Sequence, residues 1–546
     1  MIKEKELYRL IKSFRLIRSI IWIVIIFLPI TIYSQQTSAH FICKPCNASC
    51  DTLKFDSAGV CPVCKMVLLD KRAFSKDVVF KPFSPQALKE DFQVFRTALE
   101  KSHPGLYWHT PKTILDRAFD SAYSSIKGPM NILEYSRLIF PIVYKIGCGH
   151  TFINLPDSAT SFLLQEGKFF PFDVIFKDNK AYVYKNNSQD LSILPGSEIL
   201  QINNQPVKKI KEQLFAFISM DNNTATGKHK VLNANFVEFY KYFIGDADTF
   251  HLQLRDQHLV KVAALSKGDI AKNRVSNSAN NKKMATPIQG SSDKILSFNV
   301  LSTSATAIVK IKNFIDPLIK TEGYKFETFI DSAFKQVREQ GIKNLVIDIR
   351  GNPGGSNGNA GYLFSYLTDK PFRVDQYWEV KTLPLPYIDF SAIKDSEGKP
   401  IELKDEDFIK VSEDIYRKKY YPSYDTVYPR NNTFRGKLYV IIDGWVGSEA
   451  ASFASLVAHD KRGIFIGEET GGSYNGCTAG LLGKTVLPNT KLDMTIPVFK
   501  IVRFTDAENE HKGIRPDYVV EPSMSDLFNG VDRELIFILN RICGKD

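Results

Sequence analysis

The chain has 546 residues, enough for several domains of ordinary size. Hydrophobic residues make up 44% and charged residues 24%, which is typical of a globular protein and excludes a largely disordered one. The net charge of +11 is spread without a dense basic stripe, so no nucleic-acid partner is predicted.

The N-terminal segment has the pattern of an export signal. Basic residues precede an apolar run at residues 20–33, which has the length of a signal-peptide core and is short for a membrane span. The small residue Ser34 suits a cleavage site. We predict that residues 1–34 are a signal peptide, with an uncleaved membrane anchor as the alternative. Either reading places the bulk of the protein outside the cytoplasm, in the periplasm or cell envelope.

Residues 38–70 form a Cys-rich segment. Two CxxC pairs with suitable spacing offer four thiolates for a tetrahedral zinc ion, at Cys43, Cys46, Cys61 and Cys64, with Cys50 between the pairs. Two disulfides or a redox-active CxxC are the alternatives in an oxidising compartment. The segment resembles short heavy-metal-binding ribbons whose second knuckle reads CPxCGM, with Lys65 in place of the usual glycine. We predict a structural zinc ion here and no cofactor for catalysis.

The rest of the chain divides into four parts. Apolar residues three and four apart predict helices in residues 85–165, and short alternating runs predict strands in residues 166–265. Residues 266–292 are polar and are interpreted as a linker. Strands then alternate with helices in residues 293–546, which predicts an α/β domain with a largely parallel sheet. The fold class is therefore α/β within an α+β multidomain protein.

Two strand ends in the last part carry candidate catalytic groups. Ser448 follows an apolar strand and begins a helix, and "GNPGG" follows the strand at residues 345–349. A serine at a helix start is often only an N-cap, so this reading stays open. A nucleophile there would have backbone N–H donors for an oxyanion at Gly354, Gly355 and Glu449.

A nucleophilic serine needs a base and an acid that orients the base. His150 in "CGHTFINL" lies between the helical part and a strand, and Glu508 and Glu510 lie near a turn at Gly513. A single histidine is more often structural than catalytic, so these residues alone leave the base open.

Six ordered motifs resemble the C-terminal processing, or tail-specific, serine peptidases: "CGHT", "LVIDIRGNPGG", "GSEAASFA", "IGEETGG", "LPNTKL" and "GIRPD". The resemblance implies a ClpP/crotonase-like core and a PDZ-like domain at residues 166–265, where "LPGSEILQINNQPV" matches. It places Ser473 at the lysine position of the Ser-Lys branch. The tricorn-like branch instead implies the catalytic residues Ser448, His150 and Glu510, with Gly149 in place of a supporting serine.

The sequence thus predicts an exported serine endopeptidase that acts on proteins or peptides. Two alternatives remain: an inactive relative that binds peptides or hydrophobic ligands, and a metal carrier or sensor in which the Cys-rich ribbon is the functional part. A membrane is a partner only if the N-terminal segment stays uncleaved, and no oligomeric state is predicted.

Overall fold

The computed structural model describes residues 41–43, 50, 53–70, 76–256, 259–282, 294–301, 304–389, 393, 399–506 and 512–544. The chain divides into two compact units, residues 1–72 and 73–546, and each is described by itself. The predicted signal segment lies outside the described residues. Within them, no helix has both the length and the hydropathy needed to cross a membrane.

The first unit contains a small antiparallel sheet in the order β2-β1-β3, formed by Lys54–Phe55, Phe41–Ile42 and Leu69–Asp70. Its core consists of the side chains of Cys43, Cys50, Cys61 and Leu68, all of which are buried. Because so few apolar side chains are buried, a core of this size is too small to hold a fold without cross-links or a metal ion.

The second unit begins with helices α2 (Lys76–Val79), α3 (Pro85–Ser102), α4 (Lys112–Ser125) and α5 (Ile132–Lys145). Ser84 caps α3 by accepting a hydrogen bond from the Ala87 N–H, and Asn131 and Glu134 form a capping box at the start of α5. Strand β4 (Phe152–Asn154) and helix α6 (Asp157–Glu166) follow. The helices predicted for this part are therefore present.

A second sheet has the order β10-β9-β7-β6-β5, and β8 pairs with β7. Its strands are β5 (Phe172–Lys177), β6 (Lys180–Asn186), β7 (Glu198–Ile202), β8 (Gln205–Pro206), β9 (Thr249–Leu254) and β10 (Val260–Ala263). Helices α7 (Val207–Phe215) and α8 (Ala225–Phe239) and the π-helix η4 (Tyr240–Ile244) come between β8 and β9.

The predicted linker is partly helical, which corrects the sequence interpretation of residues 266–292. Helices α9 (Lys267–Ser276) and α10 (Ser278–Lys282) lie within it. The Asn277 side chain donates to the carbonyl oxygens of Asn186 and Ser188 at 3.1 and 2.9 Å, so these helices are fixed to the end of β6. Asparagine-rich sequence is typical of loops, but here its amides form specific bonds that the linear pattern does not reveal.

The central sheet has the order β11-β12-β13-β17-β18-β21 and is parallel except for β11. The strands are β11 (Leu296–Leu301), β12 (Thr306–Ile311), β13 (Asn344–Asp348), β17 (Lys437–Ile442), β18 (Ile464–Gly467) and β21 (Tyr518–Val519). This sheet confirms the predicted α/β architecture.

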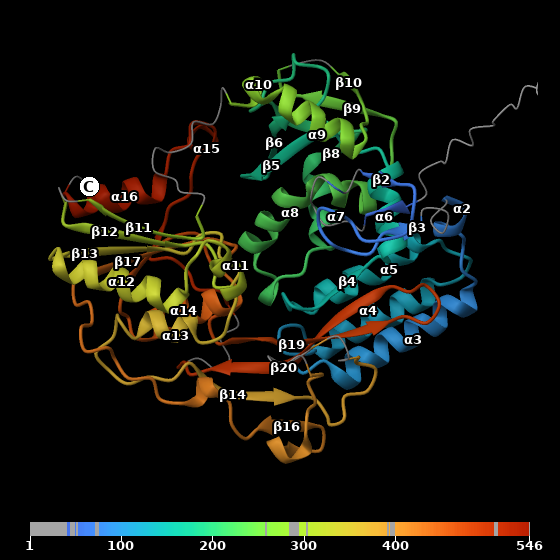
Figure 1. Ribbon diagram of the computed structural model, residues 1–546. Helices are drawn as coiled ribbons and strands as arrows, with labels where there is room; N and C mark the ends of the chain where they lie inside the picture. The colour runs from blue at the N-terminus through green and yellow to red at the C-terminus, as the bar shows by residue number, and fades with distance from the viewer. Residues whose placement is uncertain are drawn as a thin grey trace, which may run out of the picture. The chain divides into compact units, whose positions relative to one another are not determined.

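Helices cover both faces of the central sheet (Figure 1). One face packs against α12 (Phe326–Glu339), α13 (Asn359–Phe364) and α14 (Ser448–His459), and the other packs against α16 (Arg533–Ile542). The short helices α11 (Asp316–Thr321) and α15 (Met524–Asn529) lie in its connections. Because both faces are covered, its strands are almost wholly apolar, as in "NLVID" and "KLYVII".

The last sheet joins the helical part to the part of the chain that contains Ser448. Its order is β15-β16-β14-β20-β19, formed by Phe408–Ser412, Ile415–Lys418, Asp375–Val380, Asp493–Arg503 and Gly476–Val486. Strand β4 also pairs with β20, and the long β19–β20 hairpin lies beside α3 and α4 (Figure 1). A segment near residue 150 is thereby brought to the domain that contains Ser448.

Candidate active site

Ser448 lies at the junction between β17 and α14, as predicted. The N-cap of α14 is Gly447, and Ser448 is the first helical residue, with a left-handed φ of +48°. No side-chain capping hydrogen bond is formed at this helix start. A non-glycine residue in this region of φ costs about 1–3 kcal/mol, and such strained residues often lie at active sites. The capping interpretation of Ser448 therefore fails.

The glycine turn after β13 packs directly on Ser448. A Cβ atom at Gly354 would lie 2.6 Å from the Ser448 Cβ and 2.8 Å from the Glu449 nitrogen, and the φ of Gly354 is +109°. Only glycine permits this approach. The Gly354 N–H donates to Asn352 Oδ1 at 2.9 Å, whereas those of Gly355 and Glu449 donate to no other described residue. Gly354 thus packs beside the Glu449 nitrogen, and the N–H groups of Glu449 and of the neighbouring Gly355 are not used by other described residues.

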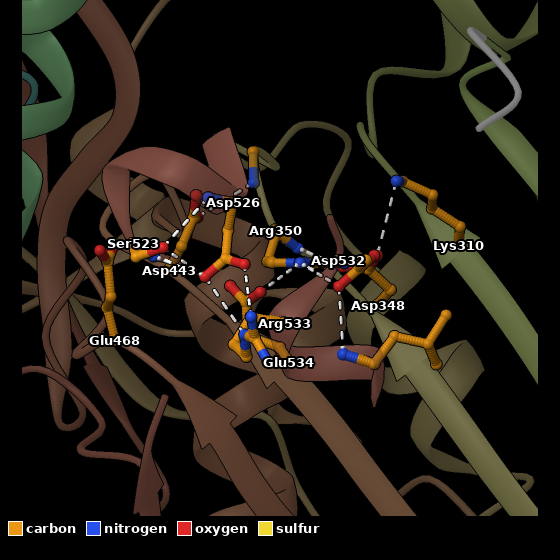
Figure 2. A network of polar contacts seen from close by, with 12 residues as sticks. Lys310, Asp348, Arg350, Asp443, Glu468, Ser523, Asp526, Asp532, Arg533 and Glu534 are labelled. Carbon is orange, nitrogen blue, oxygen red and sulfur yellow. Dashed lines mark hydrogen bonds and ion pairs between the residues drawn. The ribbon is translucent and has the colours of Figure 1, made fainter. Parts of the chain in front are cut away.

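A buried polar network holds the ends of the central strands in place (Figure 2). Arg350 donates to both carboxylate oxygens of Asp348 and of Asp532, at 2.8–3.0 Å. Burial raises the pKa of Asp348, but the positive charges of Arg350 and Lys310 lower it more. The pKa of Asp348 therefore lies below its ordinary value. Asp443 at the end of β17 accepts from the Gly351 N–H at 3.0 Å, so the glycine turn and the segment that leads to Ser448 are tied together.

His150 lies in the loop between α5 and β4. The neighbouring Gly149 N–H donates to Asp221 Oδ1 at 2.7 Å, and the Thr151 hydroxyl lies 2.7 Å from His103 Nε2. Burial lowers the pKa of His103 to about 3, so this anchoring imidazole is neutral. Its Nδ1 accepts from the Gly105 N–H, which leaves the proton on Nε2 to donate to Thr151.

This loop is linked to the segment around Ser448 through the 3₁₀ helix η3 (Asp221–Asn223). After Asp221, Thr224 Oγ1 donates to the Gly471 carbonyl oxygen at 3.2 Å. A Cβ at Gly472 would lie 3.4 Å from the Ser448 nitrogen. Within the described residues, no hydrogen bond joins Ser448 Oγ to His150, and the buried His150 Nδ1 has no partner.

Glu510, the predicted orienting acid, lies outside the described residues, as does Glu508. The described residues after it return to the site: Gly513 pairs with Ser473, and the Ile514 N–H donates to Thr470 Oγ1 at 2.8 Å. Ser473, at the position aligned with the lysine of the Ser-Lys branch, is fully buried, and its Oγ has no partner among the described residues.

The Cys-rich ribbon also has a defined cluster. The thiols of Cys43, Cys50, Cys61 and Cys64 lie within 4.8 Å of one another. Four thiolates 2.3 Å from a zinc ion would be about 3.8 Å apart, so the cluster fits such an ion with a small contraction. Cys46 lies outside the described residues, and Cys50, which was not predicted as a ligand, is the fourth thiol of the described cluster. Lys65 has a φ of +64°, which explains the glycine usual in similar ribbons.

Comparison with known proteins identifies the part of the chain that contains this site. Residues 305–520 match peptidase family S41. This part, less than half of the chain, is similar to the S41 peptidases. The protein is accordingly an enzyme, a serine-type peptidase, and the match agrees with the predicted kinship to C-terminal processing proteases. Among curated protein sequences, none matches the chain.

Solved structures support the fold of this peptidase. Mature CPAF in complex with lactacystin is 14% identical, with a TM-score of 0.56 and coverage of 84% of this chain and 99% of that chain. A serine-to-alanine mutant of CPAF is also 14% identical, with a TM-score of 0.58 and coverage of 84% and 97%. At this identity the likeness concerns the fold alone, and it extends over most of the chain.

Two groups near Ser448 were missed by sequence reasoning. The buried Arg503 guanidinium donates to the Ser448 carbonyl oxygen and to Ser452 Oγ, each at 3.0 Å. Asp375, also buried, accepts from Trp378 Nε1 at 2.8 Å. The sequence held a usable signal for Arg503, because this lone arginine ends the apolar run "IPVFKIVR". The sequence around Asp375 offered none.

Proposed function

We propose that the protein is an exported serine endopeptidase that uses a Ser-His-Glu mechanism. The observation that carries the proposal is the left-handed Ser448 at the strand–helix junction, packed on Gly354 beside two N–H groups that donate to no described residue. This arrangement presents a nucleophile and oxyanion donors at one point.

In the proposed mechanism, Ser448 Oγ attacks the carbonyl carbon of a peptide bond while His150 takes the hydroxyl proton. The Gly355 and Glu449 N–H groups stabilise the negative charge that develops on the carbonyl oxygen. His150 then donates its proton to the leaving amine, and water hydrolyses the acyl-enzyme by the same route in reverse. Glu510 orients the imidazole by accepting from Nδ1, the buried nitrogen without a described partner.

Paired serine variants test the nucleophile. Ser448→Ala should abolish cleavage of a quenched fluorescent casein and labelling by a fluorophosphonate probe, because it removes the hydroxyl proposed to attack the substrate. Ser473→Ala is the matched control and should keep most of the activity, because a serine cannot replace the base of the Ser-Lys branch. Equal losses in the two variants would instead assign the chemistry to the segment around residue 473.

Paired histidine variants test the base. His150→Ala should lower the rate by several orders of magnitude, because the serine proton then has no acceptor. His459→Ala, at the partly exposed end of α14, should leave the rate nearly unchanged. Near-native activity of His150→Ala would contradict the Ser-His-Glu assignment.

We further propose that residues 1–34 direct export and that the ribbon binds one zinc ion through Cys43, Cys50, Cys61 and Cys64. The basic and apolar pattern at the N-terminus supports export. N-terminal sequencing of the envelope fraction should find Gln35 first, and an intact Met1 would indicate an anchor. The four clustered thiols support the metal site.

A further inference from the structure

A cavity of about 680 Å³ opens beside the proposed nucleophile. Glu449, the residue after Ser448, lines it together with Asn357 and Gly358, which follow the glycine turn. The Gly358 N–H donates to Glu449 Oε1 at 2.9 Å, so the cavity wall is continuous with the segment that supplies the oxyanion donors. A substrate residue flanking the scissile bond would meet this cavity first.

Four aromatic side chains line the cavity. Trp378 and Tyr421 lie stacked with their ring centroids 3.8 Å apart, and Tyr362 and the exposed Tyr428 also line the space. Such faces suit the methylene stem of a long side chain, and their electron-rich surfaces attract a cation.

Two buried carboxyl groups lie in the same walls. Glu449 and Asp375 are 7% and 5% exposed, and neither forms an ion pair with a described residue. Glu449 Oε1 accepts from the N–H groups of Gly358 and Ala360, whereas Oε2 makes no hydrogen bond with the described part of the chain. Burial raises the pKa of Glu449 to about 7, and burial also raises that of Asp375. A positive charge bound near both carboxyl groups would lower both pKa values.

The protein supplies only part of the balancing charge. Arg503 acts electrostatically on both acids, but its hydrogen bonds go to neutral oxygens such as those of Ser448 and Ser452. Arg430 lines the cavity with an exposed side chain stacked 4.4 Å above the Tyr362 ring. With both acids ionised, Arg503 offsets one of the two negative charges, and Arg430 forms no described ion pair with either acid.

We propose that this cavity binds a lysine or arginine side chain of the substrate next to the scissile bond, with Glu449 and Asp375 as the acidic partners. The inference rests on the proposed function, because it identifies the cavity as a subsite of that active site. A basic side chain of this length would place its cation at the carboxylates and its stem along the aromatic rings. Binding would then align the peptide carbonyl with Ser448.

Matched peptides test the proposal. Quenched fluorescent peptides would differ at one position only, lysine or norleucine, with that position moved along the sequence. Norleucine has nearly the same hydrocarbon chain as lysine but no charge. The kcat/KM for the lysine peptide divided by that for the norleucine peptide therefore measures the contribution of the cation. We expect lysine to be favoured at least tenfold at one position beside the cleaved bond.

Variants of the walls should change this ratio. Asp375→Asn and Glu449→Gln should each lower it at least fivefold. Tyr428→Lys places a competing cation on an exposed wall, where misfolding is no concern, and should lower it as well. Glu339→Gln, which removes an exposed carboxylate on α12, is the control and should leave it unchanged.

The outcomes separate the two proposals. A lysine to norleucine ratio near one, in an enzyme that cleaves both peptides and is labelled at Ser448, would overturn the subsite and leave the peptidase assignment intact. A high ratio that survives all three wall variants would also overturn it. Failure of Ser448 to react with a fluorophosphonate and to cleave any peptide would overturn both proposals.

Discussion

At the scale of single residues, the strained backbone of Ser448 is the feature that links structure to chemistry. Its left-handed φ turns the side chain out of the regular path of α14. Two contacts hold Ser448 in this conformation: its close packing on Gly354, and the hydrogen bond that Arg503 donates to the Ser448 carbonyl oxygen. A conformation that costs free energy persists only where its surroundings enforce it, and here both enforcing groups come from distant segments.

Glu449 should make stability depend on pH. Its carboxyl group has an ordinary pKa of 4.5 and a folded-state pKa of about 7. Between these values the folded protein holds a proton that the unfolded chain has lost, so the free energy of unfolding falls as pH rises from 4.5 to 7. The fall amounts to at most about 3 kcal/mol and ends above pH 7, where both states are ionised.

Glu449→Gln isolates this effect, because the amide oxygen still accepts from Gly358 and Ala360 but cannot ionise. Urea unfolding at several pH values should show the variant gaining stability relative to the natural protein as pH rises through this window. Parallel stability curves for the two proteins would show that Glu449 ionises normally and would remove the electrostatic argument for the cavity.

At the scale of elements, the ribbon shows how tertiary structure selects ligands. Its strands are two residues long, and its core is largely cysteine side chains. The two CxxC pairs predicted Cys43, Cys46, Cys61 and Cys64, whereas the described thiols that lie together include Cys50. The fold therefore brings Cys50, which belongs to neither CxxC pair, beside the thiols of Cys43, Cys61 and Cys64.

Zinc analysis of two variants distinguishes the ligand sets. Protein purified without chelator should hold one zinc ion, and Cys50→Ser should lose most of it, because this change removes one of the four clustered thiols. Cys46→Ser is the comparison variant, and on the proposed ligand set, which does not include Cys46, it should retain the ion. The reverse result would restore the predicted set. Two disulfides without metal, found by mass spectrometry, would contradict both sets.

At the scale of the whole peptidase unit, the helical part and the catalytic part share one core. Leu487, Met494 and Ile496 of the β19–β20 hairpin are buried among the helices of residues 85–145. Fully buried Asp91 on α3 accepts from the N–H groups of Asn489 and Thr490, each at 2.8 Å. The predicted domain boundaries at residues 165 and 293 therefore do not separate independently packed domains.

Asp91→Ala should destabilise the protein by about 2–5 kcal/mol, because two backbone N–H groups in the shared core lose their acceptors. It should also lower activity, since the same core positions the loop of His150. Urea unfolding and casein cleavage measure the two effects. The control is Glu100→Ala, which removes a partly exposed pair with Arg96 and should cost less than about 1 kcal/mol. Equal effects of the two variants would show that the hairpin contact is dispensable.

The sequence by itself determined the alternation of strands and helices, the place of Ser448 at a strand end and the glycine turn that packs on it. These features follow from local rules: apolar periodicity fixes the elements, and glycine permits backbone conformations that other residues avoid. Only the tertiary structure decided that Cys50 joins the thiol cluster, that Arg503 and Asp375 lie near the nucleophile, and that residues 267–276 are helical. Each of these depends on contacts between segments far apart in the chain, and no local pattern encodes which distant partner will bury a charge or accept a hydrogen bond.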